Sequence, residues 1–339
     1  MSVTIKDIAT IAGVSFSTVS LVLNGKASEN RISGELEKKI LEIAEELNYR
    51  PNSLARSLRK GVTNSIGFVI SDISNAFFIK LARRVEKEAM NHGYRVFFAS
   101  SDENDSKCVE VIDSFLNQRV DGLILIPTQG IEEKLTQLSM QKIPFVLVDR
   151  HFPKVNANCV VMNNWQSAYD ATDYLIKKGK KRIGTFSYDT SFFHMAERLE
   201  GYKAALKDSS IRFDKRLVPE VPFWDDVKTS VLLKEYIPYF VEDLKIDSVF
   251  FQTNSTALPG IQILYDQYIK KGKEISVICF DDNDFFKLLQ PPITSLIQPI
   301  EEMGVESVRI LIDEIKNKRA NKIMKNKIVY SAQLVDRGT

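Results

Sequence analysis

The sequence predicts two kinds of fold in one chain: a small all-α unit over about the first sixty residues, and an α/β body in the remainder. Near the N-terminus, two short helices with apolar faces are separated by a glycine. After residue 64, short apolar strands alternate with amphipathic helices, which is typical of parallel sheets with helices on both faces. Because this alternation occurs as two successive series, we expect the body to form two similar lobes.

The N-terminal unit is predicted from its helix boundaries. Thr4 can act as a side-chain N-cap, and Asp7 takes the acidic position of a capping box. Gly13 permits a tight turn at a positive φ, and Ser15 can cap a second helix. Two helices joined by a Gly-containing turn indicate a helix-turn-helix, whose second helix lies in a DNA major groove. The alternative is a plain helical hairpin that packs against another element.

A third helix and a basic segment follow. The third helix begins at Ser33 and is stopped by Pro51, after which Asn52 can cap a new helix that ends before Gly61. A helix of about two turns is marginal in water, so we expect this segment to be coil until a partner orders it. From residue 47 to residue 71 there are basic residues and no acid: Arg50, Arg56, Arg59 and Lys60. Such a segment suits contacts with phosphates, and a solvated linker is the alternative.

Charge and cysteine usage limit the classes of function. The chain of 339 residues has a net charge of only +2, and residues 1–60 carry that surplus. Any affinity for nucleic acid must therefore come from a local patch. The three cysteines, Cys108, Cys159 and Cys279, are scattered, which favours buried thiols over disulfides or a metal site. We see no signal peptide and no apolar run long enough to span a membrane, so we expect a cytoplasmic protein.

The sequence gives no support for an enzyme. It contains no G-x-S-x-G, no GxGxxG and no phosphate-binding loop. The histidines are isolated, and we expect His92 at a helix end and His151 and His194 in loops. The run from Asp281 to Asp284 lacks the glycine of a calcium loop. We therefore expect no catalytic residues, no metal and no cofactor.

The body contains two series of expected strands and helices. The first series has strands at 65–70, 94–100, 122–126 and 145–148 and helices near 77–91, 107–118 and 131–140. The second series has strands at 159–162, 182–187, 248–251 and 275–280 and helices near 165–178, 195–207, 227–240 and 261–271. Ligands of open α/β sheets bind at the carboxyl ends of the strands, so the cleft between the lobes is the expected site.

Several ordered motifs resemble the headpiece and hinge of the lactose-repressor (LacI/GalR) family of bacterial transcriptional regulators. They are Thr4-Ile5-Lys6-Asp7-Ile8-Ala9, Ala12-Gly13-Val14-Ser15, Thr18-Val19-Ser20, Val22-Leu23-Asn24-Gly25 and Tyr49-Arg50-Pro51-Asn52 with Ala55-Arg56-Ser57-Leu58. The resemblance continues over nearly the whole chain. It implies a helix-turn-helix headpiece at 1–50, a hinge at 51–61 and a periplasmic-binding-protein-like effector and dimerisation domain at 62–339. It places 62–161 and 292–322 in the lobe nearer the DNA, and 162–291 and 323–339 in the far lobe.

The resemblance also implies how the headpiece would bind a pseudo-palindromic operator. Phe16, Ser17 and Leu21 would face base edges of the double-stranded DNA. Family members commonly carry Arg at the position of Leu21, and without that Arg the bidentate contact with guanine is lost. We therefore expect half-sites that differ from the commonest family type. Polar side chains would contact phosphates: Thr4, Ser15, Thr18, Ser20 and Asn24.

The hinge is expected to fold on contact with DNA. Leu58 from each chain would wedge a central minor-groove step and bend the duplex. The other hinge residues expected at the DNA are Asn52, Ala55 and Arg56.

Seven residues are expected to bind an effector between the lobes. They are Phe77, Phe78, Asp149, Arg198, Trp224, Asn254 and Asp281. Arg198 begins an R-x-x-G-[YFW] element, whose Arg reaches the ligand in the family. Carboxylate, guanidinium and amide groups with an aromatic face suit a polyhydroxylated ligand, because each hydroxyl both donates and accepts. The structural alternatives are an ion pair between Asp149 and Arg150 and a helix-surface position for Arg198.

Two departures from the family pattern bear on the ligand. Asn254-Ser255 stands where the family often has Asn-Asp, and Leu258-Pro259-Gly260 replaces a helix-friendly segment. We expect Pro259 to delay or kink the start of its helix.

The sequence thus predicts a repressor that acts as a homodimer and is controlled by a sugar or sugar derivative. The alternative is a sugar-binding protein of the periplasmic type without a DNA role. The helix-turn-helix favours the first. Whether the effector releases DNA or is required for binding stays open.

Overall fold

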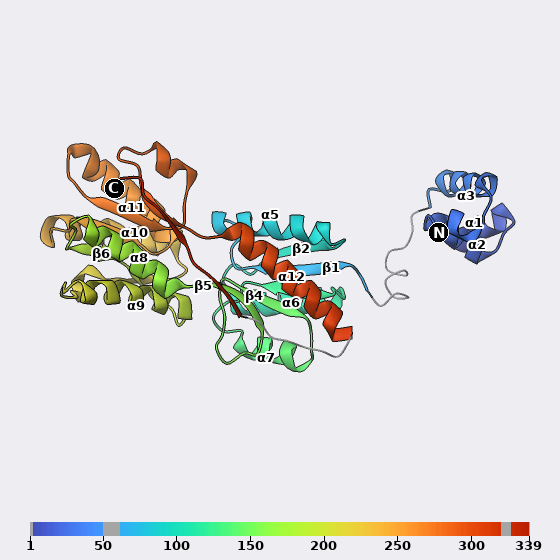
Figure 1. Cartoon of the computed structure of the whole chain (residues 1–339), viewed down its shortest axis with the longest axis horizontal. Helices are drawn as coiled ribbons and strands as arrows, with labels where there is room; N and C mark the ends of the chain where they lie inside the picture. The colour runs from blue at the N-terminus through green and yellow to red at the C-terminus, as the bar shows by residue number, and fades with distance from the viewer. Residues whose placement is uncertain (1–2, 50–61, 320–326, 339) are drawn as a thin grey trace. The chain divides into compact units, whose positions relative to one another are not determined.

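The computed structural model describes residues 3–49, 62–319 and 327–338 (Figure 1). The chain divides into two compact units, Met1–Thr63 and Asn64–Thr339. The expected hinge residues Asn52, Ala55, Arg56 and Leu58 lie outside the described residues.

Among the described residues of the first unit, 3–49 form a three-helix headpiece. Its helices are α1 (Ile5–Ala12), α2 (Phe16–Leu23) and α3 (Gly34–Glu46), with a short 3₁₀ turn at Ser28–Asn30. Their apolar faces meet in one small core: Ile8, Ala9, Ala12, Val19, Val22, Ala27, Ile40, Ile43 and Ala44. This core explains why short helices, which are marginal alone, are stable here.

The predicted caps of the headpiece are confirmed. The Asp7 carboxylate accepts hydrogen bonds of 2.8 Å from both the backbone N–H and the hydroxyl of Thr4. Gly13 adopts a φ of 71° at the turn, which a glycine reaches without strain. The Ser15 hydroxyl accepts from the backbone N–H of Thr18 at 3.1 Å. These contacts fix where α1 ends and where α2 begins.

The second unit contains two lobes, and the first lobe is built on a fully parallel sheet. Its strand order is β12–β5–β4–β3–β1–β2. The strands are β1 (Ser65–Ile70), β2 (Arg95–Ser100), β3 (Gly122–Leu125), β4 (Phe145–Val148), β5 (Asn158–Met162) and β12 (Lys327–Tyr330). The helices are α5 (Ala76–Asn91), α6 (Asp105–Asn117), α7 (Glu132–Met140) and α12 (Ile300–Arg319).

Alternate side chains of each central strand in this sheet enter different cores. Phe68 packs with α5 and α12, whereas its neighbour Val69 packs with α6 and α7. The strands therefore read as continuous apolar runs, because both faces of the sheet are covered.

The second lobe repeats this plan with one antiparallel edge. Its strand order is β13–β11–β10–β9–β6, in which β13 is antiparallel to β11. The strands are β6 (Ile183–Thr185), β9 (Ser248–Phe251), β10 (Ser276–Phe280), β11 (Thr294–Ile297) and β13 (Gln333–Val335). The helices are α8 (Asn164–Lys177), α9 (Phe193–Asp208), α10 (Asp226–Pro238) and α11 (Asn254–Gln267).

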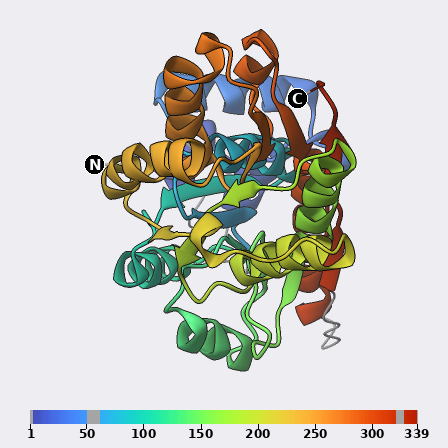
Figure 2. The same ribbon diagram turned by 90° about the vertical axis from the view of Figure 1, so that its left-hand side faces the viewer.

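Helices cover both faces of the second sheet (Figure 2). Phe250 packs toward α8 and α9, while Val249 and Phe251 pack toward α10 and α11. A small parallel pair, β7 (Ser187–Asp189) and β8 (Glu220–Pro222), extends this lobe beside the carboxyl end of β6.

The chain crosses between the lobes after β5, after β11 and after β12, and these crossings correct the expected boundaries. Residues 292–322 were assigned to the first lobe and 323–339 to the second. Instead, β11 pairs with β10 in the second sheet and β12 pairs with β5 in the first. The chain from residue 292 onward therefore alternates between the two lobes. It does not divide into one segment for the first lobe and one for the second.

The start of α11 also differs from the prediction. The helix begins at Asn254 and contains Pro259 in its interior, so the proline does not delay the start. At the next residue, Gly260, an added Cβ would lie 2.4 Å from the ring of Phe251. This close approach holds the helix against β9.

Two further findings concern the cysteines and the helices. Cys108, Cys159 and Cys279 are buried free thiols, as predicted. Within the described ranges, no single helix is long and apolar enough to cross a membrane; α1 and α2 pass such a test only as a pair bent by 110°.

Candidate functional site

A cavity of about 290 Å³ lies between the two lobes, at the carboxyl ends of their strands. All seven residues predicted to bind an effector line it: Phe77, Phe78, Asp149, Arg198, Trp224, Asn254 and Asp281. They come from loops and helix starts that are far apart in the chain. The fold brings them together because the carboxyl ends of parallel strands share one edge of each sheet.

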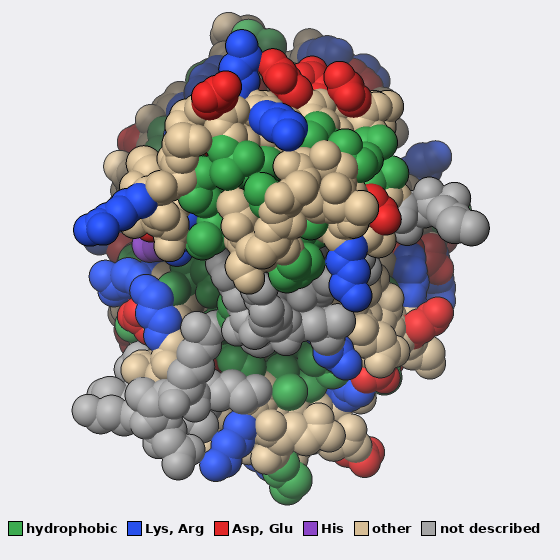
Figure 3. Space-filling model, turned by 90° about the vertical axis from the view of Figure 1, so that its right-hand side faces the viewer, with side chains coloured by type: hydrophobic (Ala, Val, Ile, Leu, Met, Phe, Trp, Pro, Cys, Tyr) green, Lys and Arg blue, Asp and Glu red, His purple; other side chains and the backbone are tan. Residues whose placement is uncertain are grey.

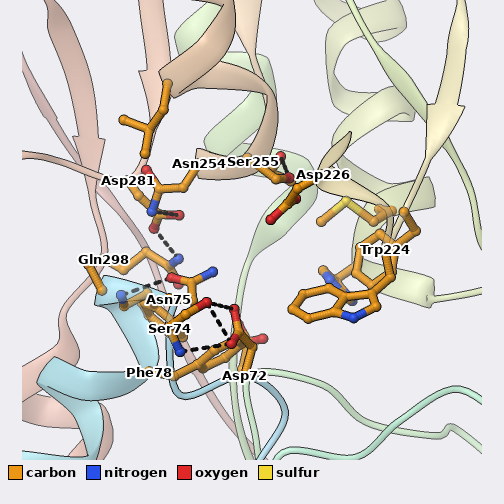
Figure 4. Close-up of a pocket in the computed structure, with 18 of the residues that line it drawn as sticks. Asp72, Ser74, Asn75, Phe78, Trp224, Asp226, Asn254, Ser255, Asp281 and Gln298 are labelled. Carbon is orange, nitrogen blue, oxygen red and sulfur yellow. Dashed lines mark hydrogen bonds between the residues drawn. The ribbon is translucent and has the colours of Figure 1, made fainter. Parts of the chain in front are cut away.

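The loop after β1 forms one wall of the cavity (Figure 4). Asp72 accepts hydrogen bonds from the backbone N–H of Ser74 at 2.7 Å and from its hydroxyl at 2.8 Å. Asn75 caps α5 by accepting from the N–H of Phe77 at 3.0 Å. The rings of Phe77 and Phe78 are buried and meet edge to face, with centroids 5.1 Å apart. This wall therefore combines an apolar surface with a fixed carboxylate.

Asp149 and Arg150 follow β4 and are both buried. Asp149 adopts a φ of 68°, in the left-handed region. The Arg150 guanidinium donates to both carboxylate oxygens of Glu103 and only approaches Asp149, with 3.6 Å between Nε and Oδ2. Burial raises the pKa of Asp149 to about 6, although Arg150 and Arg198 counteract it. Arg150 therefore pairs mainly with Glu103, and the Asp149 carboxylate stays available to a ligand.

Arg198 projects from α9 into the interior and is 4% exposed, so it is not a helix-surface residue. Its Nε donates to Asn164 Oδ1 at 2.9 Å, and its Nη1 donates to the Gln252 carbonyl at 2.5 Å. The guanidinium carbon lies 3.4 Å from the centroid of the Phe280 ring. These contacts hold the side chain in one orientation at the cavity.

Gly201 explains the spacing of the R-x-x-G element. A Cβ at Gly201 would lie 2.2 Å from the backbone oxygen of Trp165 in α8. Only glycine allows the two helices to approach this closely, and that approach sets the position of Arg198 one turn earlier.

Asp281 follows β10 and is held by two amide side chains. Its Oδ1 accepts from Gln298 Nε2 at 2.5 Å, and its Oδ2 accepts from Asn254 Nδ2 at 3.3 Å. Like Asp149, it has a positive φ, of 72°. Burial raises the pKa of Asp281, and the nearby Arg198 counteracts this effect.

Trp224 lies across the cavity from Gln298 and Asn75 (Figure 4). Its side chain is 42% exposed, so the indole offers a free aromatic surface. Ser255, which departs from the family pattern, also lines the cavity, and its hydroxyl is 2.9 Å from that of Thr253.

Several lining residues were missed or misplaced by sequence reasoning. His194 was expected in a loop, but it is a buried residue in the first turn of α9, one turn before Arg198. Its i, i+4 spacing from Arg198 could have revealed it. Burial and the two neighbouring arginines lower its pKa well below the usual range. Gln298 was missed because it follows β11, a strand that the sequence analysis did not predict.

The predicted DNA-contacting residues of the headpiece lie on α2 and at its two caps, except Thr4, which precedes α1. Phe16 is 46% exposed, Ser17 is exposed and Leu21 is half-buried. The Asn24 side chain is engaged at the end of the helix, since its Nδ2 donates to the Ser20 backbone carbonyl at 2.5 Å. The helix from Phe16 to Leu23 contains no acidic residue, so it presents no carboxylate to a phosphate.

On the face that Figure 3 shows, charged side chains of both signs are mixed. In Figure 3, Lys, Arg, Asp and Glu side chains are interspersed, with hydrophobic side chains exposed between them. This distribution agrees with the near-zero net charge. It leaves DNA affinity to local contacts and not to a global field.

Comparisons with known proteins cover both units. The profile described as "Bacterial regulatory proteins, lacI family" matches residues 4–52. The profile described as "Periplasmic binding proteins and sugar binding domain of LacI family" matches residues 63–329. A catabolite control protein A from Priestia megaterium is 32% identical over 313 residues, which is 92% of each chain. A ribose operon repressor from Haemophilus influenzae is 29% identical over 318 residues, covering 94% of this chain and 93% of that one.

Solved structures share the fold. The lac repressor dimer bound to operator and the anti-inducer ONPF superposes with a TM-score of 0.82 at 20% identity, over 99% of this chain and 98% of that one. The transcriptional regulator CelR in complex with cellobiose has a TM-score of 0.69 at 24% identity, over 98% of both chains. With its headpiece, its two-lobed body and relatives that match along its length, the chain belongs to the LacI family of bacterial regulatory proteins, which are DNA-binding transcriptional regulators and not enzymes.

Proposed function

We propose that this protein represses transcription as a homodimer on a pseudo-palindromic operator, and that a sugar or sugar derivative bound between the lobes controls its operator affinity. The observation that carries the proposal is the presence, in one chain, of a helix-turn-helix and a cavity between two lobes that is lined by polar and aromatic side chains. Because its target is DNA, the proposed place of action is the cytoplasm.

A polyhydroxylated effector suits the chemistry of the cavity. Asp149, Asp281 and Asn254 supply hydrogen-bond acceptors, and Arg198 supplies donors. Trp224 offers an aromatic face on which an apolar face of a sugar ring can stack. The volume of about 290 Å³ is at the lower end of the range for ligand sites, which favours a small sugar. Among the relatives, one is a ribose operon repressor and one was solved with cellobiose.

The proposed DNA contacts divide into two kinds. Phe16, Ser17 and Leu21 would read base edges, with apolar contacts to thymine methyl groups and a hydroxyl contact from Ser17. Thr4, Ser15, Thr18, Ser20 and Asn24 would bind phosphates and fix the register of the headpiece. A phenylalanine that is nearly half exposed at the start of α2 supports the first role, since burial against DNA would remove its surface from water.

Coupling between effector and DNA follows from the position of the cavity. Both lobes contribute to its walls, so a ligand that contacts both favours one arrangement of the lobes over others. A hundredfold change in operator affinity requires a coupling free energy of about 2.7 kcal/mol, which is within the usual range for allostery.

A DNA-binding selection on random duplexes, repeated with a panel of sugars, tests the proposal. We expect a two-fold symmetric site whose affinity changes with one ligand, and the direction of the change distinguishes an inducer from a co-repressor. A symmetric site without any ligand response would refute the sugar effector. Failure to enrich any site would refute the DNA role and leave a sugar-binding protein.

A further inference from the structure

The amide groups beside Asp281 have a fixed polarity. A carboxylate offers only acceptors, so the N–H₂ ends of Gln298 and Asn254 must face Asp281, and their oxygens point elsewhere. Both residues line the cavity, and Gln298 Oε1 and Asn254 Oδ1 are buried without a hydrogen-bond partner. Figure 4 shows the three side chains together at one end of the cavity. Buried acceptors of this kind are normally satisfied, so this end of the cavity suits a ligand that donates hydrogen bonds.

The positive groups of the cavity are partly engaged by the protein itself. Arg150 donates to both oxygens of Glu103 and to the Pro127 carbonyl at 3.2 Å. Arg198 donates to a side-chain amide oxygen and to a backbone carbonyl, and its face lies against Phe280. No lysine is among the described residues that line the cavity. Arg150 is therefore occupied by a bidentate carboxylate, whereas Arg198 keeps three N–H groups that can still donate to a ligand.

Among the described residues that line the cavity, carboxylates outnumber cations, and Lys80 of the adjoining groove lies near enough to Asp281 to counteract the rise in its pKa. Four aspartates line it: Asp72, Asp149, Asp226 and Asp281. The two arginines oppose them, and one of these is paired with the buried Glu103. A phosphomonoester adds a charge of about −1.5 to −2 at pH 7. Burying that charge beside an excess of carboxylates would be strongly unfavourable.

We infer that the cavity selects a sugar that is uncharged or carries an amine, and rejects phosphorylated sugars. Hydroxyl or ammonium groups of the ligand donate to Gln298 Oε1 and Asn254 Oδ1. This inference rests on the proposed function, because it takes the cavity as the effector site, and it adds the charge class of the ligand.

Isothermal titration of the full-length protein tests the selection. The probes are matched sets of an aldose, its 2-amino analogue and its phosphomonoester, such as D-glucose, D-glucosamine and D-glucose 6-phosphate, with equivalent sets for galactose and ribose. We expect one free or amino sugar to bind at least tenfold more tightly than its phosphomonoester. A phosphomonoester that binds as tightly as its parent sugar would overturn the inference and leave the proposed function intact. Binding by no member of any set would refute the sugar effector itself, and the inference with it.

A charge-matched pair of variants tests the cause. Asp226→Asn removes one carboxylate at the exposed mouth of the cavity, so we expect the preference for the unphosphorylated sugar to fall severalfold. Asp243→Asn makes the same charge change at an exposed residue that does not line the cavity, and we expect no change in preference. An equal change in both variants would show that net charge, and not the acceptor-rich cavity, causes the discrimination.

Discussion

Replacing Arg198 by Met distinguishes the contribution of this residue to stability from its contributions to effector binding and to DNA binding. Arg198→Met removes the donors to Asn164 Oδ1 and to the Gln252 carbonyl. Hydrogen bonds to charged groups contribute about 1.5–3 kcal/mol each, and the stacking on Phe280 adds about 0.5–2 kcal/mol. Relief of the desolvated guanidinium offsets part of this loss. We therefore expect the body to lose about 2–4 kcal/mol of unfolding free energy.

Urea unfolding followed by tryptophan fluorescence measures this loss in the body alone, because both tryptophans, Trp165 and Trp224, lie in the second lobe. The same variant should keep its operator affinity without effector and lose its response to effector. Arg216→Met is the control, since Arg216 is exposed and its ion pair is local; it should change stability by less than about 0.5 kcal/mol. Wild-type stability together with a normal effector response in Arg198→Met would refute the reasoning.

Four further predictions follow from the site and the headpiece. The raised pKa of Asp149 favours its protonated form in the folded state. Below about pH 4 this effect adds roughly 3 kcal/mol to the free energy of unfolding, and the addition is lost as the pH rises through 6. Urea titrations at pH 4.5 and 7.5 should show this component in the wild type and not in Asp149→Asn. Gly201→Ala should lower the unfolding free energy by about 1–3 kcal/mol, measured in the same assay, because the new methyl group meets the backbone of Trp165. Leu21→Arg should shift the selected half-site toward guanine, with a discrimination of about 1–3 kcal/mol. Leu58→Ala should weaken specific operator binding far more than non-specific binding in gel-shift titrations.

Each of these predictions has a contrary outcome. The same pH dependence in Asp149→Asn and the wild type would assign that dependence to other groups. An unchanged stability in Gly201→Ala would mean that α8 and α9 can separate without cost. A half-site that does not respond to Leu21→Arg would remove this residue from the base contacts. Equal losses of specific and non-specific binding in Leu58→Ala would refute the wedge.

The sequence predicts most of the body because its central strands have both faces covered. The runs at 65–70, 145–148 and 248–251 are continuous apolar segments, and the structure has strands with the same bounds. Strand β12 was not predicted because its side chains alternate between exposed and half-buried positions and it forms the edge of its sheet. An edge strand with one open face gives a weak signal, and its partner β5 lies more than 160 residues earlier in the chain.

The cavity was predictable where a residue directly follows a recognised strand. Asp149 and Asp281 follow β4 and β10 in this way, and all parallel strands of one sheet end at the same edge. What those residues contact was not predictable. The pairing of Arg150 with Glu103 joins positions 47 residues apart, and the orientation of the Gln298 amide depends on a strand that the pattern did not reveal.

The two aspartates explain why the arrangement of the lobes can depend on a ligand. One belongs to each lobe, and both have a positive φ, a conformation that costs a non-glycine residue about 1–3 kcal/mol and that persists where the surrounding structure enforces it. Both carboxylates are buried; Asp281 contributes to the raised pKa of Asp149, and Arg198 counteracts the rise in the pKa of both. A ligand that donates to both would replace this repulsion with hydrogen bonds from each lobe. Such a ligand would therefore stabilise the arrangement that brings the aspartates together relative to others, which is the differential stabilisation that effector control of DNA binding requires.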